Sequence, residues 1–478
     1  MSRPSRRLRA GLLAAASAAL VAAALPAPMP LGIGDPLYPN LGNPGYDVLS
    51  YDIGLTYGGS NTKPLSAVTV IDARATEALE RVNLDFTHGT VDSVEVNGAR
   101  ADFATSGEDL VVTPAAAVPA GDLLRITVHH TSDPRGGQAG GWVRTGDGLV
   151  MANQADAAHR VFPCNDHPSD KAFFTFRVTV PKGLTAVANG LELPRTRHAG
   201  SVTSTYRTAH PMATELAQVS IGRSTVLRRT GPHGLPVRDV VPAADRTKLE
   251  PWLKKTPAQL AWMESKVGPY PFETYGLLIA DMDTGFELET QTLSLFERSM
   301  FTRAEYPEWY VDSIMVHELS HHWFGDSVSP HAWSDLWLNE GHATWYEALY
   351  AQEQADQPME RRMRDAYTDS DGWRAAGGPP ARPRRAEPGQ QIGIFRPVVY
   401  DGSALVLYAL RQEIGAGAFE QLEREWVREY RDGTATTADF SALASRISGR
   451  DLSGFFQAWL YGERTPPMPG HPDWHSER

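Results

Sequence analysis

The fold is decided by residues 317–321, His317-Glu318-Leu319-Ser320-His321, and by Glu340, which follows after eighteen intervening residues. On an α-helix of 3.6 residues per turn, positions four apart lie about 40° from each other. His317 and His321 therefore project from one face and can bind the same metal ion, whereas His322 cannot share that face. The spacing predicts a metal site made of two imidazoles and one carboxylate.

Two histidines and a glutamate are protein ligands that Zn²⁺ accepts. Three such ligands leave the fourth tetrahedral position for water, which distinguishes a catalytic zinc site from a closed structural one. Glu318 lies between the two histidines and is the candidate general base that takes a proton from this water. We therefore expect one Zn²⁺ ion, bound by His317, His321 and Glu340, and hydrolysis as the chemistry.

Two helices are expected to carry these residues. Residues 310–324 have apolar side chains at helical spacing and no Gly or Pro, and residues 335–350 read as a second helix that includes Glu340. Glu347 lies on the same face as Glu340, where it could accept the free ring N–H of a zinc-bound histidine. A solvated helix charge is an equally good interpretation of Glu347. For the motif itself, the alternative is a chance match on a solvated helix, which this apolar context disfavours.

Several separate strings resemble the gluzincins, and within them the aminopeptidase N family, which includes the leukotriene hydrolase/aminopeptidases. Residues 317–326 (HELSHHWFGD) and 337–341 (WLNEG) are similar to the family's zinc signature almost letter for letter. Residues 162–168 (FPCNDHP) and 268–272 (GPYPF) resemble two further landmarks of the family. The resemblance covers nearly all of the chain after its first 45 residues and implies a zinc aminopeptidase whose partners are peptides with a free N-terminus.

Residues 285–291 (GFELETQ) occupy the place of the family's Gly-x-Met-Glu-Asn exopeptidase motif. Leu288-Glu289-Thr290 replaces Met-Glu-Asn, and the glycine falls one position too early. The resemblance implies that Glu289 binds the free α-amino group of the substrate. A carboxylate near the metal gains a charge-assisted hydrogen bond only from a peptide whose N-terminus is within reach. Gln154 matches a family glutamine that lines the substrate cleft from the first domain.

Peptide hydrolysis passes through a tetrahedral intermediate whose oxyanion needs a donor opposite the metal. Residues 399–404 (VYDGSA) resemble the family segment in which a tyrosine hydroxyl plays this part, which assigns the role to Tyr400. Ser403 stands where the family usually has glycine. The alternative for Tyr400 is a tyrosine packed before a core helix, because apolar residues follow it at helical spacing.

Residues 1–27 are expected to form an export signal. Four arginines precede an Ala- and Leu-rich stretch, and small residues follow near positions 24–27. The apolar part is short for a membrane span, which needs roughly 20 residues, so an uncleaved anchor is the less favoured alternative. We expect a secreted or extracytoplasmic protein without stable membrane insertion after signal removal. The sequence leaves the oligomeric state unknown.

Charge and cysteine content narrow the class of protein. The formal net charge is −12, and it becomes −16 when the four arginines of residues 1–27 are removed (−12 − 4). This balance argues against nucleic acid as a partner. Cys164 is the only cysteine of the sequence, which excludes an intrachain disulfide. Stability then depends on buried apolar side chains, and a chain of 478 residues exceeds the usual size of a single core.

The expected fold class is α+β with two domains. Residues 43–240 contain short alternating apolar runs broken by Gly, Pro and Asn, and are expected to form a mostly antiparallel β domain. Residues 230–236 (TGPHGLP) are the expected hinge region. Residues 241–466 are expected to form a thermolysin-like catalytic domain, with a helix near 248–266, strands near 275–288 and mainly helices after them.

Residues 467–478 are expected to form a short tail, and the family's C-terminal helical-repeat domain is expected to be absent, which would leave an open cleft. Two rival functions remain at this stage. A secreted zinc endopeptidase of gluzincin type would share the metal site and cleave internal bonds. A non-catalytic peptide-binding relative would keep the fold without the chemistry.

Overall fold

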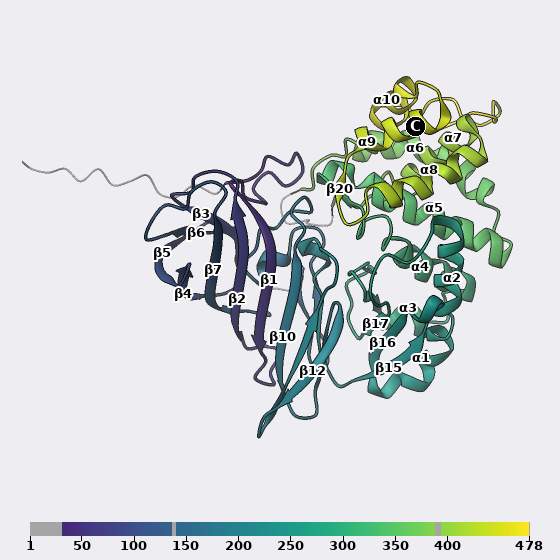
Figure 1. The fold of residues 1–478 in the computed structure, drawn as a ribbon. Coiled ribbons are helices and arrows are strands. Elements are labelled where there is room, and N and C mark those ends of the chain that lie inside the picture. The colour runs from purple at the N-terminus through teal and green to yellow at the C-terminus, as the bar shows by residue number, and fades with distance from the viewer. Residues whose placement is uncertain (1–30, 136–139, 388–392, 478) are drawn as a thin grey trace, which may run out of the picture.

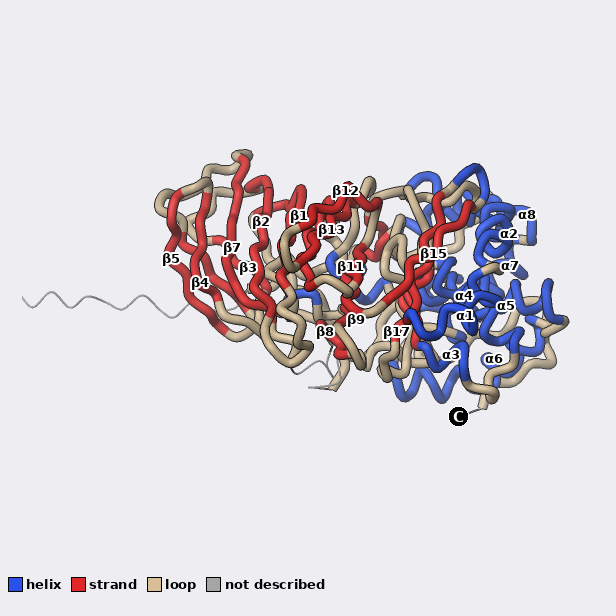
Figure 2. The backbone as a smooth tube through the Cα atoms, turned by 90° about the horizontal axis from the view of Figure 1, so that it is seen from below, coloured by secondary structure: helices blue, strands red, loops and turns tan. Residues whose placement is uncertain are grey.

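The computed structural model describes residues 31–135, 140–387 and 393–477, so the expected export signal at residues 1–27 lies outside the described residues. Two lobes follow each other along the chain, the first built from strands and the second mainly from helices (Figure 1). The view from below shows the same segregation, with strands in the first lobe and helices in the second (Figure 2). The α+β, two-domain expectation is confirmed.

The first lobe is organised by a large twisted sheet. Its strands β1 (Tyr46–Thr56) and β2 (Leu65–Ala75) pair antiparallel and alternate buried with more exposed side chains along most of their length. This period-two pattern is typical of a sheet with one face on a core. A register shift between Val48 and Ser50 interrupts the alternation in β1, and β10 (Phe173–Pro181) pairs parallel to β1 on its other side.

Within the described residues, this sheet has ten strands in the order β12-β13-β10-β1-β2-β7-β4-β5-β6-β3, and a four-stranded sheet β11-β14-β9-β8 lies in the same lobe. The remaining strands of the lobe are β3 (Val82–Asp85), β4 (Val91–Val96), β5 (Ala99–Ser106), β6 (Asp109–Thr113), β7 (Leu123–Ser132), β8 (Gly141–Arg144), β9 (Leu149–Ala152), β11 (Thr185–Ala188), β12 (Leu191–Arg197), β13 (Ser201–Arg207) and β14 (Val219–Gly222).

A second four-stranded sheet joins the two lobes. Its order is β15 (Ser224–Thr230), β16 (Pro236–Pro242), β17 (Leu277–Ala280) and β18 (Ser294–Glu297). Its two faces serve different cores, since Val240 packs in the core of the first lobe while Val237 and Val241 pack in that of the second. Successive side chains of a strand point to opposite faces, which allows one strand to contribute to both cores.

The expected hinge at residues 230–236 is wrong. Strands β15 and β16 pair antiparallel with Thr230 opposite Pro236, so these residues form the turn of a hairpin within one sheet. Gly and Pro mark tight turns as well as linkers, and the sequence pattern is the same for both. Residue 240, the expected domain boundary, lies inside β16, and sheet membership changes before β15.

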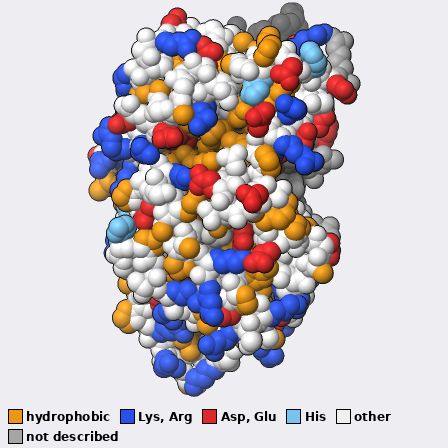
Figure 3. Space-filling model, turned by 90° about the vertical axis from the view of Figure 1, so that its right-hand side faces the viewer, with side chains coloured by type: hydrophobic (Ala, Val, Ile, Leu, Met, Phe, Trp, Pro, Cys, Tyr) orange, Lys and Arg blue, Asp and Glu red, His pale blue; other side chains and the backbone are white. Residues whose placement is uncertain are grey.

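Helices make up most of the second lobe. Their bounds, with the short β19 and β20 between them, are α1 (Arg246–Leu253), α2 (Thr256–Val267), α3 (Arg298–Thr302), α4 (Glu308–Ser320), β19 (Ser329–Pro330), α5 (Trp337–Ala355), α6 (Met359–Gly377), α7 (Asp401–Ile414), α8 (Ala416–Glu429), β20 (Thr434–Ala435), α9 (Thr437–Ser448) and α10 (Ser453–Tyr461). On the face of this lobe drawn in Figure 3, acidic and basic side chains lie beside each other around a hollow with hydrophobic side chains on its floor.

Two expected elements differ from the structure. The helix near 248–266 is two helices, because Pro257 fits the first turn of α2 but cannot continue α1. The strand near 275–288 ends at Ala280, after which Leu288 returns to the sheet through a single bridge to Leu295.

The expected tail is part of the core of the second lobe. Trp474 is buried and stacks on His471 and Tyr408, with ring centroids 4.2 and 5.9 Å away. Met468 packs in the same core. Two large apolar side chains in a short segment are enough to hold it against α7. None of the described helices is both long and apolar enough to span a bilayer.

Candidate active site

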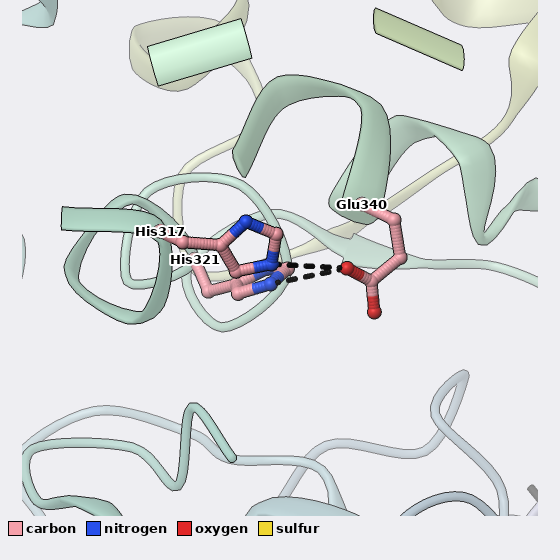
Figure 4. A group of neighbouring side chains, drawn as sticks. All are labelled: His317, His321 and Glu340. Carbon is pink, nitrogen blue, oxygen red and sulfur yellow. Dashed lines mark ion pairs between the residues drawn. The ribbon is translucent and has the colours of Figure 1, made fainter. Parts of the chain in front are cut away.

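Helices α4 and α5 bring the predicted metal ligands together. His317 lies on α4 and His321 directly follows its last residue with helical dihedral angles (φ −56°, ψ −27°), so both point the same way. Glu340 lies on α5, which packs against α4. Its Oε2 atom is 3.3 Å from Nε2 of His317 and 3.4 Å from Nε2 of His321 (Figure 4). All three side chains are buried.

This geometry fits a zinc ion. Ligand atoms that bind zinc at about 2.1 Å in a tetrahedral arrangement are roughly 3.4 Å apart, which matches the two separations from Glu340. Oε2 of Glu340 is fully buried and has no hydrogen-bond partner, although burying such an atom is costly. A cation between Glu340, His317 and His321 satisfies it.

The other ring nitrogens of the histidines are held from behind. Nδ1 of His317 is 3.1 Å from Oε2 of Glu347, and Nδ1 of His321 is 3.1 Å from the carbonyl oxygen of Phe324. Such contacts fix the ring orientation and leave Nε2 of each histidine free to bind a metal. Glu347 is buried, which decides against a solvated helix charge and in favour of the supporting role.

The buried carboxylates of the cluster depend on positive charge beside them. Burial raises the pKa of Glu318 to about 8, and repulsion from Glu289 and Glu340 adds to this while His317 and His321 oppose it. At Glu340, burial also favours the neutral acid, but the two histidines outweigh it and lower the pKa to about 2. Three carboxylates buried side by side are stable only when positive charge lies among them.

Glu289 and Gln154 meet at the boundary between the lobes. Nε2 of Gln154, from the first lobe, donates to Oε1 of Glu289 at 2.7 Å. Glu289 is buried, and its carboxylate lies within 4.8 Å of ligand atoms of Glu318 and His321. Burial raises its pKa. Glu289 does not lie in a strand, because it follows the single bridge at Leu288.

Tyr400 lies beside His317, directly before α7. Its ring centroid is 6.1 Å from that of His317. Burial raises the pKa of Tyr400 well above its ordinary value, which keeps the phenol protonated and able to donate. Helix α7 approaches α5 very closely, because a Cβ atom added to Gly341 would lie only 2.7 Å from Cβ of Ser403. Glycine at position 341 thus accommodates Ser403 where the family usually has glycine.

His322 points away from the metal cluster, as its helix position predicts. It forms hydrogen bonds with the hydroxyl of Tyr270 at 2.8 Å and with that of Ser294 at 3.1 Å. Burial lowers the pKa of His322 well below its ordinary value, so the ring is neutral. Residues 268–272, which include Tyr270, therefore hold the chain in place just after α4.

Two basic residues beside the site, Arg362 and Lys171, are not predicted from the sequence. Arg362 on α6 donates to Oε1 of Glu347 and to Oδ1 of Asp401, both at 2.7 Å. Lys171 of the first lobe donates to the carbonyl oxygen of Asp326 at 2.7 Å, just beyond the zinc motif. Arg362 is one of several arginines on an exposed-looking helix, and no spacing or motif singles it out.

Two family models match the chain. The Peptidase M1 N-terminal domain matches residues 59–216, and the Peptidase family M1 domain matches residues 253–459. The chain belongs to the M1 peptidase family. Zinc is the metal of the related solved structures and suits the three ligands found here, so we assign one Zn²⁺ ion to this M1 peptidase site.

Curated relatives of this M1 peptidase are aminopeptidases. Aminopeptidase M1-B of Oryza sativa subsp. japonica is 25% identical over 344 residues, which are 68% of this chain and 38% of the relative. Aminopeptidase N of Streptomyces lividans is 25% identical over 440 residues, which are 86% of this chain and 50% of the relative. This chain thus spans half or less of the length of these two relatives.

A solved M1 zinc metallopeptidase from Deinococcus radiodurans has a TM-score of 0.78 and 28% identity, and the match covers 92% of this chain and 98% of that one. A mutant of a two-domain M1 zinc metallopeptidase bound to L-arginine also has a TM-score of 0.78 and 28% identity, with 92% and 99% coverage. The two lobes of this chain are therefore the two domains of that architecture.

Proposed function

We propose that this M1 peptidase is a zinc aminopeptidase that hydrolyses the N-terminal peptide bond of peptides. The observation that carries the proposal is the buried Glu289 carboxylate, whose oxygen lies within 4.8 Å of ligand atoms of Glu318 and His321. A peptide whose terminal ammonium pairs with Glu289 has its first peptide bond beside the metal. Bonds further along the chain are then out of reach.

The residues of the site have complementary tasks in this reaction. Bound zinc supplies a Lewis acid that polarises the carbonyl and makes water more acidic. Glu318 accepts the proton of the attacking water and passes it to the leaving amine. The protonated hydroxyl of Tyr400 donates to the oxyanion. Gln154 holds the Glu289 carboxylate through its hydrogen bond of 2.7 Å, which leaves the second oxygen for the ammonium.

The related proteins support a peptide substrate. The curated relatives are named as aminopeptidases, and mutants of related M1 zinc metallopeptidases were solved with Tyr-Ser-Ala and with L-arginine. The burial of Glu289 argues against the endopeptidase alternative. In an endopeptidase no substrate ammonium would pair with this carboxylate beside the metal. The convergence of the candidate zinc ligands and the candidate base argues against a non-catalytic relative, because hydrolysis requires both.

Paired reporters test the proposal. Aminoacyl amide reporters with a free N-terminus are compared with the same compounds after N-acetylation, before and after chelation and with zinc restored. We expect hydrolysis of the free compounds alone, its loss with chelator and its return with zinc. Equal rates for free and acetylated compounds, or cleavage of blocked peptides at internal bonds, would point to the endopeptidase. A fully metallated protein that cleaves neither would be the non-catalytic relative.

We also propose that the protein is exported and that residues 1–27 are removed. The support is the order of four arginines, an apolar stretch and small residues in the sequence. Expression of the full chain with a C-terminal tag, followed by fractionation and N-terminal sequencing, should find a shortened protein outside the cytoplasm. A chain that keeps residues 1–27 and sediments with membranes would instead support an uncleaved anchor.

A further inference from the structure

We propose that Arg362 is a positioning residue that fixes both a zinc ligand and the oxyanion donor of the active site. The proposal rests on the proposed aminopeptidase function and adds a residue outside the candidate ligand set, whose side-chain hydrogen bonds go to Glu347 and Asp401. Arg362 lies in the first turn of α6, on a different helix from every other residue of the site.

One arm of the Arg362 guanidinium reaches the zinc side. Nη1 donates to Oε1 of Glu347 at 2.7 Å, while Oε2 of the same carboxylate lies 3.1 Å from Nδ1 of His317. Glu347 is therefore held at both oxygens, by a cation on one side and by an imidazole on the other. A carboxylate held in this way can adopt one orientation, and it transmits that orientation to the His317 ring.

The other arm reaches the tyrosine side. Nε of Arg362 donates to Oδ1 of Asp401 at 2.7 Å. Asp401 is the first residue of α7 and is bonded directly to Tyr400. The backbone of Tyr400 is therefore tied to α6 at the point where the chain enters α7. The planar guanidinium spans the two carboxylates with fixed geometry, which a lysine ammonium cannot reproduce.

The surroundings of Arg362 make it a suitable residue to replace. It lines a cavity of about 490 Å³ together with Trp309, Tyr310 and Trp373, and its side chain is 33% exposed. A shorter polar side chain at this position meets water instead of leaving an internal void. Arg361, its neighbour on α6, is exposed and lines the same cavity, which makes it a matched control.

The test compares R362Q, R362K and the control R361Q. Zinc affinity is measured by competition with a chromophoric chelator, and kcat and KM are measured at saturating zinc with an aminoacyl reporter. For R362Q we expect zinc affinity to fall about tenfold, kcat to fall about tenfold and KM to change less than about twofold. R362K should recover part of both losses, and R361Q should behave like the unmodified protein.

Double variants separate positioning from a merely structural role. In a Tyr400→Phe background, R362Q should lower kcat less than about threefold further, because Arg362 acts through the hydroxyl already removed. R361Q with Tyr400→Phe should be additive. Asp401→Asn is a second route to the tyrosine arm, and it should lower kcat while leaving zinc affinity unchanged.

An unchanged zinc affinity in R362Q, or full additivity with Tyr400→Phe, overturns the proposal. The zinc measurement needs no turnover, so it tests Arg362 even if the unmodified protein hydrolyses no reporter. In that case the proposed function fails and the positioning of His317 is judged by zinc alone. If R362Q does not fold, zinc affinity is tested with R362K, and the effect on kcat is tested with R362K and Asp401→Asn.

Discussion

Two buried clusters of histidine and carboxylate, one in each lobe, use the same kinds of residue for different purposes. In the second lobe, Oε2 of Glu340 faces the Nε2 atoms of His317 and His321 and has no hydrogen-bond partner. In the first lobe, Nδ1 of His159 lies 2.7 Å from Oδ2 of Asp166. Among the described residues, ligand atoms converge within 4.8 Å in the second lobe and not in the first-lobe cluster.

In the first-lobe pair, both carboxylate oxygens of Asp166 have hydrogen-bond donors among their neighbours, although Nε2 of His159 is buried without a hydrogen-bond partner. Oδ2 of Asp166 also accepts the backbone N–H of His159 at 3.0 Å, and its Oδ1 accepts the hydroxyl of Thr214 at 2.7 Å. Burial opposes the charge on His159, but the hydrogen bond to Asp166 and the Glu108 carboxylate 3.8 Å from Nε2 outweigh it and raise the pKa of His159 to about 10. Both clusters contain histidine and carboxylate. They differ in whether the carboxylate oxygens already accept hydrogen bonds, and this difference separates a metal site from a structural ion pair.

Replacing one glutamate in each cluster, Glu318 or Glu108, should give the largest difference in kcat between the two clusters. Glu318→Gln removes the general base and should lower kcat by about 10⁴-fold while zinc remains bound. Glu108→Gln in the first-lobe cluster should leave kcat unchanged, because the Glu108 carboxylate faces Nε2 of His159 at 3.8 Å and Glu108 is not one of the residues of the zinc site. Steady-state kinetics with metal analysis checks both variants. Retained turnover in Glu318→Gln would refute the base assignment.

Tyr400→Phe removes one hydroxyl from the active cluster and should lower kcat by about 10² to 10³-fold, since loss of one oxyanion donor has this size of effect. Zinc content and melting temperature should stay near those of the unmodified protein, because the ring remains. The matched control is Tyr408→Phe, further along α7, where the phenol contacts His471. Equal kcat losses for both variants would show that the effect comes from packing.

His159→Gln tests the first-lobe cluster and should lower the free energy of unfolding by about 3 kcal/mol at pH 6, because Asp166 loses its buried partner. The folded-state pKa of His159, about 10, exceeds the unfolded value of about 6.5. The stabilisation is therefore complete below about pH 6.5 and is lost as the pH rises through 10. The free energies of unfolding of the two proteins, measured by denaturant titration from pH 6 to 10, should converge as the pH rises. At each pH the two proteins should have the same kcat. A constant difference across this range would contradict a charged His159.

Glu289→Ala should lower kcat/KM by about 10- to 100-fold, less than the loss in Glu318→Gln, since a hydrogen bond to a charged group contributes about 1.5 to 3 kcal/mol. The loss should appear with free-amine reporters, whereas the low or absent hydrolysis of N-acetylated compounds should not change. Gln154→Ala should show the same selectivity with a smaller loss, because it acts by holding the Glu289 carboxylate. If free and blocked compounds lose activity equally, Glu289 is not an ammonium anchor.

The metal ligands could be predicted because their arrangement is largely local. His317 and His321 are four residues apart on one helix, and helix geometry alone places them on one face. The alternating strands of the first lobe follow from an equally local rule, the period of two. The sequence does not decide the role of Glu347, for the opposite reason. Its burial depends on which helices cover it, and periodicity along α5 contains no such information.

Sequence alone determined that His317 and His321 share one helix face and that a β-rich domain precedes a helical one, because these depend on spacing within single elements. It also predicted Glu340 as the third ligand and Glu318 as the base, from a motif. The tertiary structure decided the rest. Gln154 and Glu289 lie 135 positions apart and meet only because the two lobes pack together. Residues 230–236 form a hairpin turn instead of a hinge because β15 and β16 pair in one sheet. Arg362 reaches Glu347 and Asp401 because α6 packs beside α5 and α7. Contacts between elements that are distant in the sequence produce no periodic pattern from which they could be predicted.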